Sequence, residues 1–202
     1  MDSCDNKNDN TLASNYSLSN SNNLVYAIYT SGTTGLPKAA VIEHHSFVNL
    51  IYWYTKKFNL TAKDKFLIVS EICFDLTQKN YFSSLILGGT IYLADFGSFD
   101  ARCISQLILK NGITRINCAP SAFELIMFAL RTYSKEDYTL DHVFLGGESI
   151  SENLLKKIKS AKITKFIVNT YGPTECTDIS TYYAASLQEL DYTRIFTAIN
   201  ST

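Results

Sequence analysis

One short segment of the chain concentrates hydroxyl, glycine and lysine residues: YTSGTTGLPK, from Tyr29 to Lys38. A glycine-rich loop that leaves a strand can turn several backbone N–H groups toward one point, and hydroxyls and a lysine add further donors. The ligand that suits such a loop is a chain of phosphates. An ordinary Ser/Thr/Gly surface turn is the alternative that composition alone favours. The position of Lys38 next to Pro37 favours the phosphate interpretation.

The segment differs from the two common nucleotide-binding loops. A Walker loop needs glycine where Pro37 stands, and the residues after Lys38 predict a strand instead of a helix. The sequence contains no Gly-x-Gly-x-x-Gly run. We therefore expect phosphate to be held by a different architecture.

The remaining sequence alternates between strand and helix patterns. Apolar spacing, Gly88-Gly89 and Gly112 set most boundaries, and the Ser149-x-x-Glu152 pattern predicts a helix cap. We expect strands at 24–30, 39–44, 65–70, 90–94, 113–119, 142–145 and 165–169, and helices at 45–58, 77–87, 100–111, 121–131 and after Ser149. This alternation predicts an α/β fold, a mostly parallel sheet with helices on both faces and ligands at the carboxyl ends of the strands.

Composition limits the class of protein. The chain has 202 residues, of which 46% are hydrophobic, enough for one domain core. A net charge of −1 and a pI near 6.3 argue against a nucleic acid partner. Five scattered cysteines without a Cys-x-x-Cys pair indicate reduced thiols. The first residues lack the pattern of a secretory signal, and no apolar run is long enough to span a bilayer. We therefore expect no membrane partner and a cytoplasmic location.

The two ends of the chain differ in composition. Residues 1–23 are dominated by Asn, Ser and Asp, and so few apolar side chains cannot offset the entropy of ordering. We expect a disordered leader there and one domain over residues 24–202.

Four segments together carry a family resemblance. FDLT (Phe74–Thr77), GGES (Gly146–Ser149) and NTYGPTE (Asn169–Glu175) follow the YTSGTTGLPK loop in order. In this order they resemble the adenylate-forming superfamily of AMP-binding, acetyl-CoA synthetase-like enzymes. The asparagine before TYGPTE and the Phe-Asp pair are most similar to amino-acid adenylation domains of nonribosomal peptide synthetases. The resemblance implies the large N-terminal subdomain of such an enzyme, which joins an amino acid to ATP as an aminoacyl-adenylate and releases pyrophosphate.

The resemblance also implies roles in holding ATP. Residues of the first loop would cradle the β- and γ-phosphates: Thr30, Ser31, Gly32, Thr33, Thr34, Gly35 and Lys38. Tyr171 would lie against the adenine ring, and the other residues around the adenine would be Gly147 through its backbone, Asn169 and Gly172. Without the neighbouring motifs, Tyr171 would be interpreted as a core aromatic residue near a strand end.

Three residues would carry the catalysis. Lys38 and Thr174 would contact phosphate oxygens, Thr174 at the α-phosphate, and Glu175 would bind Mg²⁺. A carboxylate that attacks the α-phosphorus brings anions together, so the reaction needs charge neutralisation and positioning more than a general base. The alternative for Glu175 is a solvated carboxylate at the start of a helix.

Asp75 is the residue that distinguishes an amino-acid substrate. The resemblance implies that its carboxylate pairs with the α-ammonium group, which suits a partly desolvated cation. The alternative is a helix N-cap. The side-chain pocket would be lined by Leu76, Lys79, Asn117, Phe144, Gly146, Thr170, Asp178 and Ile179. Lys79 and Asp178 could meet each other or offer opposite charges, so we expect a polar or charged substrate side chain; a solvent-exposed helix lysine is the alternative for Lys79.

The resemblance covers residues 23–183, and two differences accompany it. Ala39 stands where the family has glycine, and the family's ribose aspartate, hinge and C-terminal subdomain with its lysine have no counterpart. We therefore expect a partial domain with impaired turnover, served by missing segments or a peptidyl carrier protein in trans. The alternatives are an acyl-CoA synthetase-like ligase for a carboxylic acid without an amino group, and a non-catalytic remnant.

Overall fold

The computed structural model of the chain describes residues 20–30, 35–95, 97, 99–134, 138–192 and 194–195. Strands and helices alternate along most of this length. In chain order the elements are β1 (Leu24–Thr30), β2 (Lys38–Glu43), α1 (His44–Lys57), β3 (Lys65–Ile68), α2 (Asp75–Leu87), β4 (Thr90–Leu93), α3 (Ala101–Asn111), β5 (Arg115–Cys118), α4 (Pro120–Tyr133), β6 (Leu140–Leu145), α5 (Glu152–Ala161), β7 (Thr164–Tyr171), the 3-10 helix η1 (Thr174–Cys176) and β8 (Thr181–Ser186).

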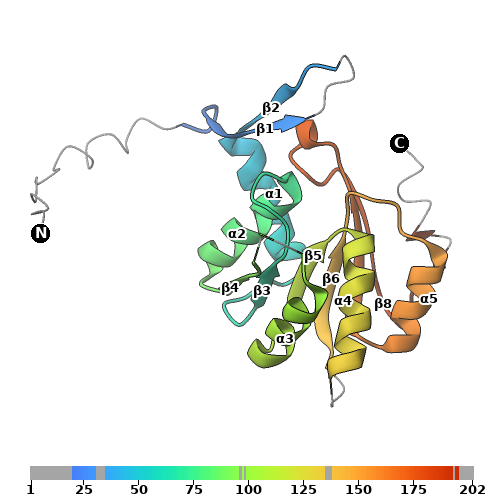
Figure 1. The fold of residues 1–202 in the computed structure, drawn as a ribbon. Coiled ribbons are helices and arrows are strands. Elements are labelled where there is room, and N and C mark those ends of the chain that lie inside the picture. Colours follow the sequence, from blue (N-terminus) through green and yellow to red (C-terminus); the bar gives the residue numbers. More distant parts are fainter. Residues whose placement is uncertain are drawn as a thin grey trace, which may run out of the picture.

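A six-stranded sheet forms the centre of the molecule in the order β4-β3-β5-β6-β7-β8 (Figure 1). Its first five strands are parallel, and β8 runs antiparallel to β7. The expected α/β class and mostly parallel sheet are confirmed. The strand β8 was not predicted from the sequence.

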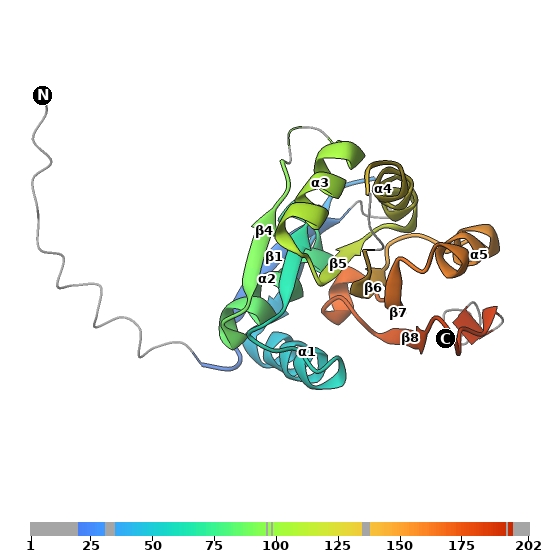
Figure 2. The same cartoon turned by 90° about the horizontal axis from the view of Figure 1, so that it is seen from below.

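Helices cover both faces of the sheet, as expected. Successive residues of a strand point to opposite faces, so Leu67 packs toward α3, α4 and α5 whereas Phe66 packs toward α1. Figure 2 shows α1 on the opposite side of the sheet from α3 and α4. Helix α2 differs from the others because it buries a polar side, with Lys79 and Asn80 among its buried residues, and exposes Leu85 and Ile86.

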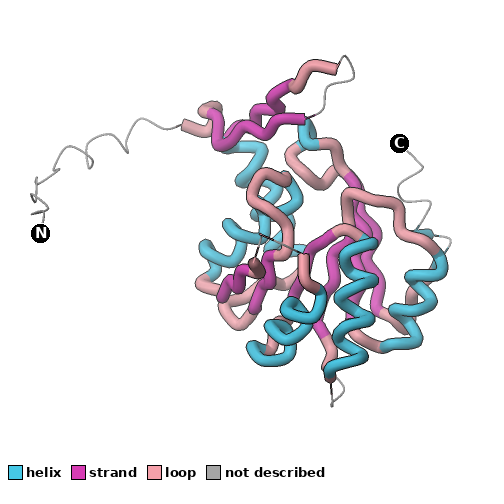
Figure 3. Tube along the Cα trace, in the orientation of Figure 1, coloured by secondary structure: helices cyan, strands magenta, loops and turns pink. Residues whose placement is uncertain are grey.

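Strands β1 and β2 form a separate antiparallel ribbon, in which Thr30 pairs with Lys38. Figure 3 shows this ribbon above the sheet, and it contacts α1 and η1. This pair of predicted strands is therefore not part of the mostly parallel sheet. The short connection between β1 and β2 explains it, because antiparallel neighbours can be joined by a loop whereas parallel strands need a long crossover.

Two smaller expectations also change. Helix α5 is capped by Ser151, whose Oγ accepts a hydrogen bond from Leu154 N at 3.1 Å, and not by Ser149. Residues 20–23, at the end of the expected leader, form a turn in which Asn23 O accepts a hydrogen bond from His44 N at 2.9 Å. Residues 1–19 lie outside the described part.

Two kinds of feature are absent from the described residues. No helix there has the length and apolar character needed to cross a membrane. In the same part of the chain, no three His, Cys, Asp or Glu side chains gather as a protein-only metal site would require.

Candidate active site

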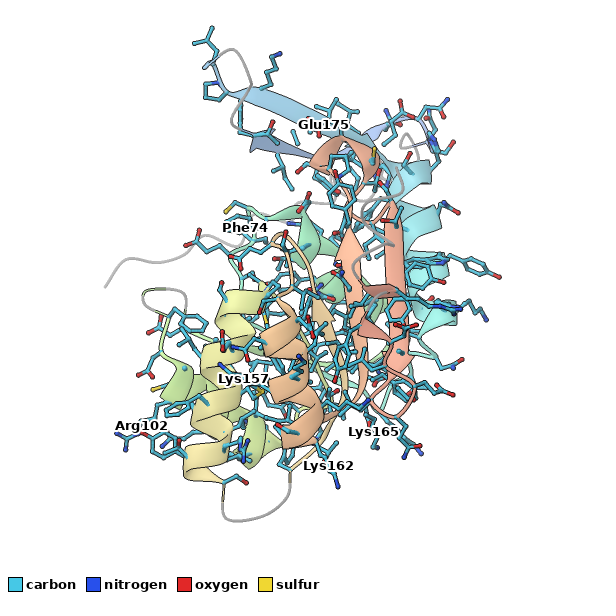
Figure 4. The ribbon with its side chains drawn as sticks, turned by 90° about the vertical axis from the view of Figure 1, so that its right-hand side faces the viewer. Phe74, Arg102, Lys157, Lys162, Lys165 and Glu175 are labelled. Atoms are coloured by element: carbon cyan, nitrogen blue, oxygen red, sulfur yellow. The ribbon has the colours of Figure 1, made fainter. Side chains whose placement is uncertain are left out.

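The candidate site lies at the carboxyl ends of the parallel strands, beneath the ribbon. Phe74 and Glu175 mark this edge in Figure 4, whereas Lys162 and Lys165 lie at the opposite edge. The FDLT and GGES segments follow β3 and β6, and the NTYGPTE segment begins within the last residues of β7, so the sheet brings three of the four motifs to one edge. The position agrees with the usual location of ligands in parallel α/β sheets.

Asp75 is the first residue of α2 and is half-buried. Phe74 holds the N-cap position, so the alternative interpretation of Asp75 as the N-cap is wrong by one residue. The Asp75 Oδ1 atom accepts a hydrogen bond from Leu76 N at 2.7 Å. The helix dipole interacts favourably with a carboxylate at the N-terminus of a helix, which is the position of Asp75 at the edge of the sheet.

The carbonyl oxygen of Leu76 holds the start of α2 against β5. It accepts hydrogen bonds from Lys79 Nζ at 2.8 Å, Asn80 Nδ2 at 3.0 Å and Asn117 Nδ2 at 3.2 Å. Asn80 Oδ1 in turn accepts from the buried Tyr54 hydroxyl at 3.1 Å. These contacts fix the position of the neighbouring Asp75 from three elements.

Lys79 and Asp178 form a buried ion pair. The distance from Lys79 Nζ to Asp178 Oδ2 is 2.6 Å, and the side chains are 0% and 8% exposed. Burial raises the pKa of Asp178, the Lys79 ammonium opposes this shift, and the charge of Asp75 adds to it. The structure thus confirms that the two charges meet, and it excludes the exposed-lysine alternative for Lys79.

A tight turn between β7 and β8 directs Asp178 into the protein. Thr177 and Asp178 both have left-handed backbones, with φ of 62° and 79°. The turn passes so close to Gly172 that a Cβ atom there would lie 1.8 Å from Asp178 O. Ser180 N donates a hydrogen bond to Tyr171 O at 2.9 Å and closes the turn. Left-handed non-glycine residues are costly and often accompany functional sites.

The remaining pocket residues lie around this ion pair. Asn117 and Phe144 are buried on β5 and β6, and the Thr170 hydroxyl donates to Leu145 O at 3.2 Å beside the backbone of Gly146. Ile179 follows Asp178 and is half-buried. The structure therefore links Leu76, Lys79, Asn117 and Asp178 directly and places Thr170 beside Gly146.

The residues expected around adenine lie at the ends of β6 and β7. Asn169 is buried, its Nδ2 donates to Ile195 O at 3.0 Å, and its Oδ1 has no partner. Tyr171 is 45% exposed at the end of β7, and Gly147 has a φ of 81°, a backbone that favours glycine. A cavity of about 630 Å³ borders on Gly146 and Gly147. The site therefore contains an unpartnered acceptor on Asn169, a partly exposed ring on Tyr171 and an exposed backbone at Gly147.

The residues expected around phosphate are only partly described. Thr30 ends β1 opposite Lys38, which is exposed at the start of β2, and Gly35 has a φ of 84°. The described Ala39 takes an ordinary strand conformation opposite Tyr29, so the family's glycine is not required there. Four expected loop residues lie outside the described part: Ser31, Gly32, Thr33 and Thr34.

Thr174 and Glu175 belong to η1, next to the ribbon. Thr174 is half-buried, whereas Glu175 is exposed and borders on a cavity of about 670 Å³ together with Ile179. Because β2 contacts η1, the strand that begins with Lys38 lies beside the helix that carries Glu175. The structure thus gathers a cation and a carboxylate on adjoining elements.

Comparison with known proteins identifies the family. The model for the AMP-binding enzyme family matches residues 2–197. The chain belongs to the AMP-binding enzyme family. Its relatives include surfactin synthase subunit 2 of Bacillus subtilis, 37% identical over 80% of this chain and 4% of the relative, and bacitracin synthase 3 of Bacillus licheniformis, 35% identical over 91% of this chain and 3% of the relative.

Solved structures agree with this membership of the AMP-binding family. The adenylation domain AlmE of Vibrio cholerae, in complex with glycyl-adenosine-5′-phosphate, has a TM-score of 0.71 and 27% identity over 85% of this chain and 32% of AlmE. The nonribosomal peptide synthetase FmoA3 in its AMPPNP-bound form has a TM-score of 0.74 and 23% identity over 85% of this chain and 18% of FmoA3, which shows the fold. This chain therefore corresponds to part of an adenylation domain.

Two tyrosines of this AMP-binding chain were not predicted as site residues. The buried Tyr26 hydroxyl has no partner, and burial, Asp178 and Asp75 raise the pKa of Tyr26 well above its ordinary value. Tyr54 supports Asn80, as described above. Both tyrosines reach the site from elements distant in sequence, and they resemble ordinary apolar-pattern residues of β1 and α1. The sequence therefore contains no local sign of their role.

Proposed function

We propose that this chain is the core of an amino-acid-activating enzyme that joins the carboxylate of an amino acid to the α-phosphate of ATP and releases pyrophosphate. The observation that carries the proposal is the Asp75 carboxylate held at a closed polar pocket, at the same sheet edge as the unpartnered Asn169 Oδ1. The first group suits an ammonium ion, and the second suits an amino group such as that of adenine.

The residues present fit ATP and Mg²⁺. Asn169 Oδ1 is an orphaned buried acceptor, and Gly147 leaves its backbone open beside a cavity. For Mg²⁺ the donor set is one exposed carboxylate, Glu175, which is appropriate because Mg²⁺ commonly uses one or two carboxylates with substrate phosphates and waters. When bound, Mg²⁺ would neutralise charge on the phosphate oxygens.

The proposed reaction is a displacement at phosphorus. A carboxylate oxygen of the amino acid forms a bond to the α-phosphorus, the bond from this phosphorus to the bridging oxygen breaks, and pyrophosphate leaves with the electron pair. Asp75 would hold the α-ammonium group and Tyr171 the adenine ring. Lys38 and Thr174 would stabilise the negative charge on the phosphates.

Further parts of the proposal come from the family. The loop Ser31–Thr34 would complete the phosphate site, and a carrier-protein thiol would accept the aminoacyl group. AlmE, whose structure holds glycyl-adenosine-5′-phosphate, supports an aminoacyl-adenylate as the product. Because the chain spans only 3–4% of the relatives named above, these steps are proposals for this chain.

Amino-acid-dependent exchange of labelled pyrophosphate into ATP tests the proposal. We expect the purified chain to exchange above a Lys38→Ala/Glu175→Ala control with at least one amino acid of a panel. Folded, monodisperse protein that neither exchanges nor binds any aminoacyl-sulfamoyl adenosine, a stable mimic of the adenylate, would contradict the proposal.

A second experiment tests the amino-acid assignment. We expect Asp75→Asn to raise the KM for the amino acid by about tenfold or more, because a charge-assisted contact is lost, with little change in the KM for ATP. Asp141→Asn is the matched control, since Asp141 pairs with Lys165 at the opposite edge of the sheet. An unchanged amino-acid KM in Asp75→Asn would instead indicate a carboxylic acid substrate without an amino group.

A further inference from the structure

We propose that the ion pair between Lys79 and Asp178 closes the side-chain pocket, so that this chain selects an amino acid with a very small side chain, of the size of glycine, alanine or serine. The inference rests on the proposed function and names the substrate class of the same site. It concerns the depth of the pocket, which the motifs alone leave open.

The floor of the pocket leaves almost no surface open to a ligand. We define the pocket floor as Lys79, Asn117, Phe144 and Asp178. Lys79 and Phe144 have 0% of their surface accessible to water, and Asn117 and Asp178 have 4% and 6%. A side chain with no accessible surface borders on no water-sized void, so a substrate side chain can enter only if the floor moves.

Electrostatics hold the floor in place. Lys79 Nζ contacts Asp178 Oδ2 at 2.6 Å and Leu76 O at 2.8 Å, and lies 5.8 Å from the centre of the Tyr54 ring. Moving the lysine aside would leave a buried carboxylate without its partner, which is far more costly than moving an apolar side chain. The ammonium therefore resists displacement by a substrate.

The backbone holds the other half of the pair. Asp178 lies in the turn with two left-handed residues, and its carbonyl packs against the bare Cα of Gly172. The carboxylate is thus fixed by main-chain geometry and not only by a rotatable side chain. Both charges are already paired with each other, which argues against a substrate that carries a charge of its own to this floor.

The open part of the site lies at its mouth. Asp75, Leu76 and Ile179 are half-buried, in contrast to the pocket floor. The α-ammonium, α-carbon and a short side chain would occupy this level.

Binding of aminoacyl-sulfamoyl adenosines to the intact chain tests the inference, because these mimics need no phosphate loop and no turnover. The panel contains the glycyl, alanyl, seryl, leucyl and phenylalanyl compounds, measured by isothermal titration calorimetry. We expect the first three to bind and the last two to bind about tenfold more weakly or worse, because a large side chain would overpack the closed floor. Leucyl or phenylalanyl binding as tight as seryl binding would overturn the inference. If no compound binds folded protein, the proposed function itself fails and the inference with it.

Two double variants separate volume from charge. Lys79→Ala/Asp178→Ala removes both charges and opens space, whereas Lys79→Met/Asp178→Leu removes both charges and keeps the volume. We expect the first to gain about tenfold or more in leucyl binding relative to glycyl binding, and the second to keep the order of the natural chain. A gain of the same size in the volume-keeping variant would show that charge, and not space, sets the selection, and would overturn the inference. The panel on the natural chain decides the question even if the alanine variant fails to fold.

Discussion

Replacing Gly172 by alanine tests how tightly the turn that carries Asp178 is packed. The added Cβ would lie 1.8 Å from Asp178 O and 2.7 Å from Ser180 N, and both are backbone atoms that cannot rotate away. A carbon and an oxygen in contact stay roughly 3.3 Å apart, so the turn must open by about 1.5 Å. This movement breaks the hydrogen bond from Ser180 N to Tyr171 O. Overpacking at about 1–3 kcal/mol and one lost hydrogen bond at about 1 kcal/mol predict a total cost of about 2–4 kcal/mol.

Urea unfolding, followed by circular dichroism, measures this cost. Gly97→Ala is the matched control, because the nearest atom to its added Cβ is the movable Asp95 Oδ1 at 3.3 Å. We expect the control to change the free energy of unfolding by less than about 0.5 kcal/mol, as surface substitutions commonly do. A loss in Gly172→Ala that does not exceed the loss in Gly97→Ala would refute the argument that the turn requires glycine.

Three further predictions concern stability, each measured by urea unfolding. Burial, and secondly repulsion from Arg115, lowers the pKa of His142 to about 4, so as the pH drops from 7 to 5 the unfolded chain takes up a proton before the folded chain does and the free energy of unfolding falls. The His142→Phe variant should lose about 1 kcal/mol less of this free energy over the same interval. An equal loss in both proteins would contradict the assignment to His142. Lys79→Met should lower the free energy of unfolding by about 3 kcal/mol, because it leaves the buried Asp178 carboxylate without its partner. The double variant Lys79→Met/Asp178→Leu should recover most of this loss. If the effects of the two single substitutions simply added in the double variant, the result would argue against the ion pair. Ser151→Ala should lower the free energy of unfolding by about 1 kcal/mol because it removes the helix cap, and Ser149→Ala by less than about 0.5 kcal/mol. A larger loss in Ser149→Ala than in Ser151→Ala would support Ser149 as the cap, as the sequence first suggested.

Local patterns in the sequence were sufficient for most of the fold. Helices α1, α3 and α4 follow the apolar spacing of helices that bury one side against a sheet. Gly88 and Gly112 end α2 and α3 with left-handed backbones, as the glycines in the sequence indicate. The ribbon and β8 were not predicted in their positions, because a strand pattern states that a segment is extended but not which strand it pairs with. Pairing depends on contacts between distant segments, which a single sequence does not display.

The candidate site shows the same division. The motifs predicted which segments lie at the carboxyl edge of the sheet. The opposite charges of Lys79 and Asp178 indicated that these two side chains could pair. That Lys79 is fully buried could not be predicted locally, since α2 turns its polar side inward. The contributions of Tyr26 and Tyr54 depend on the ribbon and α1 packing over the site. These contacts depend on tertiary structure that the motifs do not encode.

The separate ribbon also affects how folding and ligand binding are coupled. A two-stranded hairpin is marginally stable alone, so β1 and β2 depend on α1 and η1 for support, whereas the six-stranded sheet has its own core on both faces. We therefore expect the ribbon to open locally at a lower free energy than global unfolding. A nucleotide that contacts both Lys38 and the sheet edge would close this unit onto the rest of the molecule. Part of the binding free energy of the nucleotide would offset the entropy lost on ordering the ribbon. The nucleotide affinity would then depend on the local stability of the ribbon as well as on the contacts that the nucleotide makes.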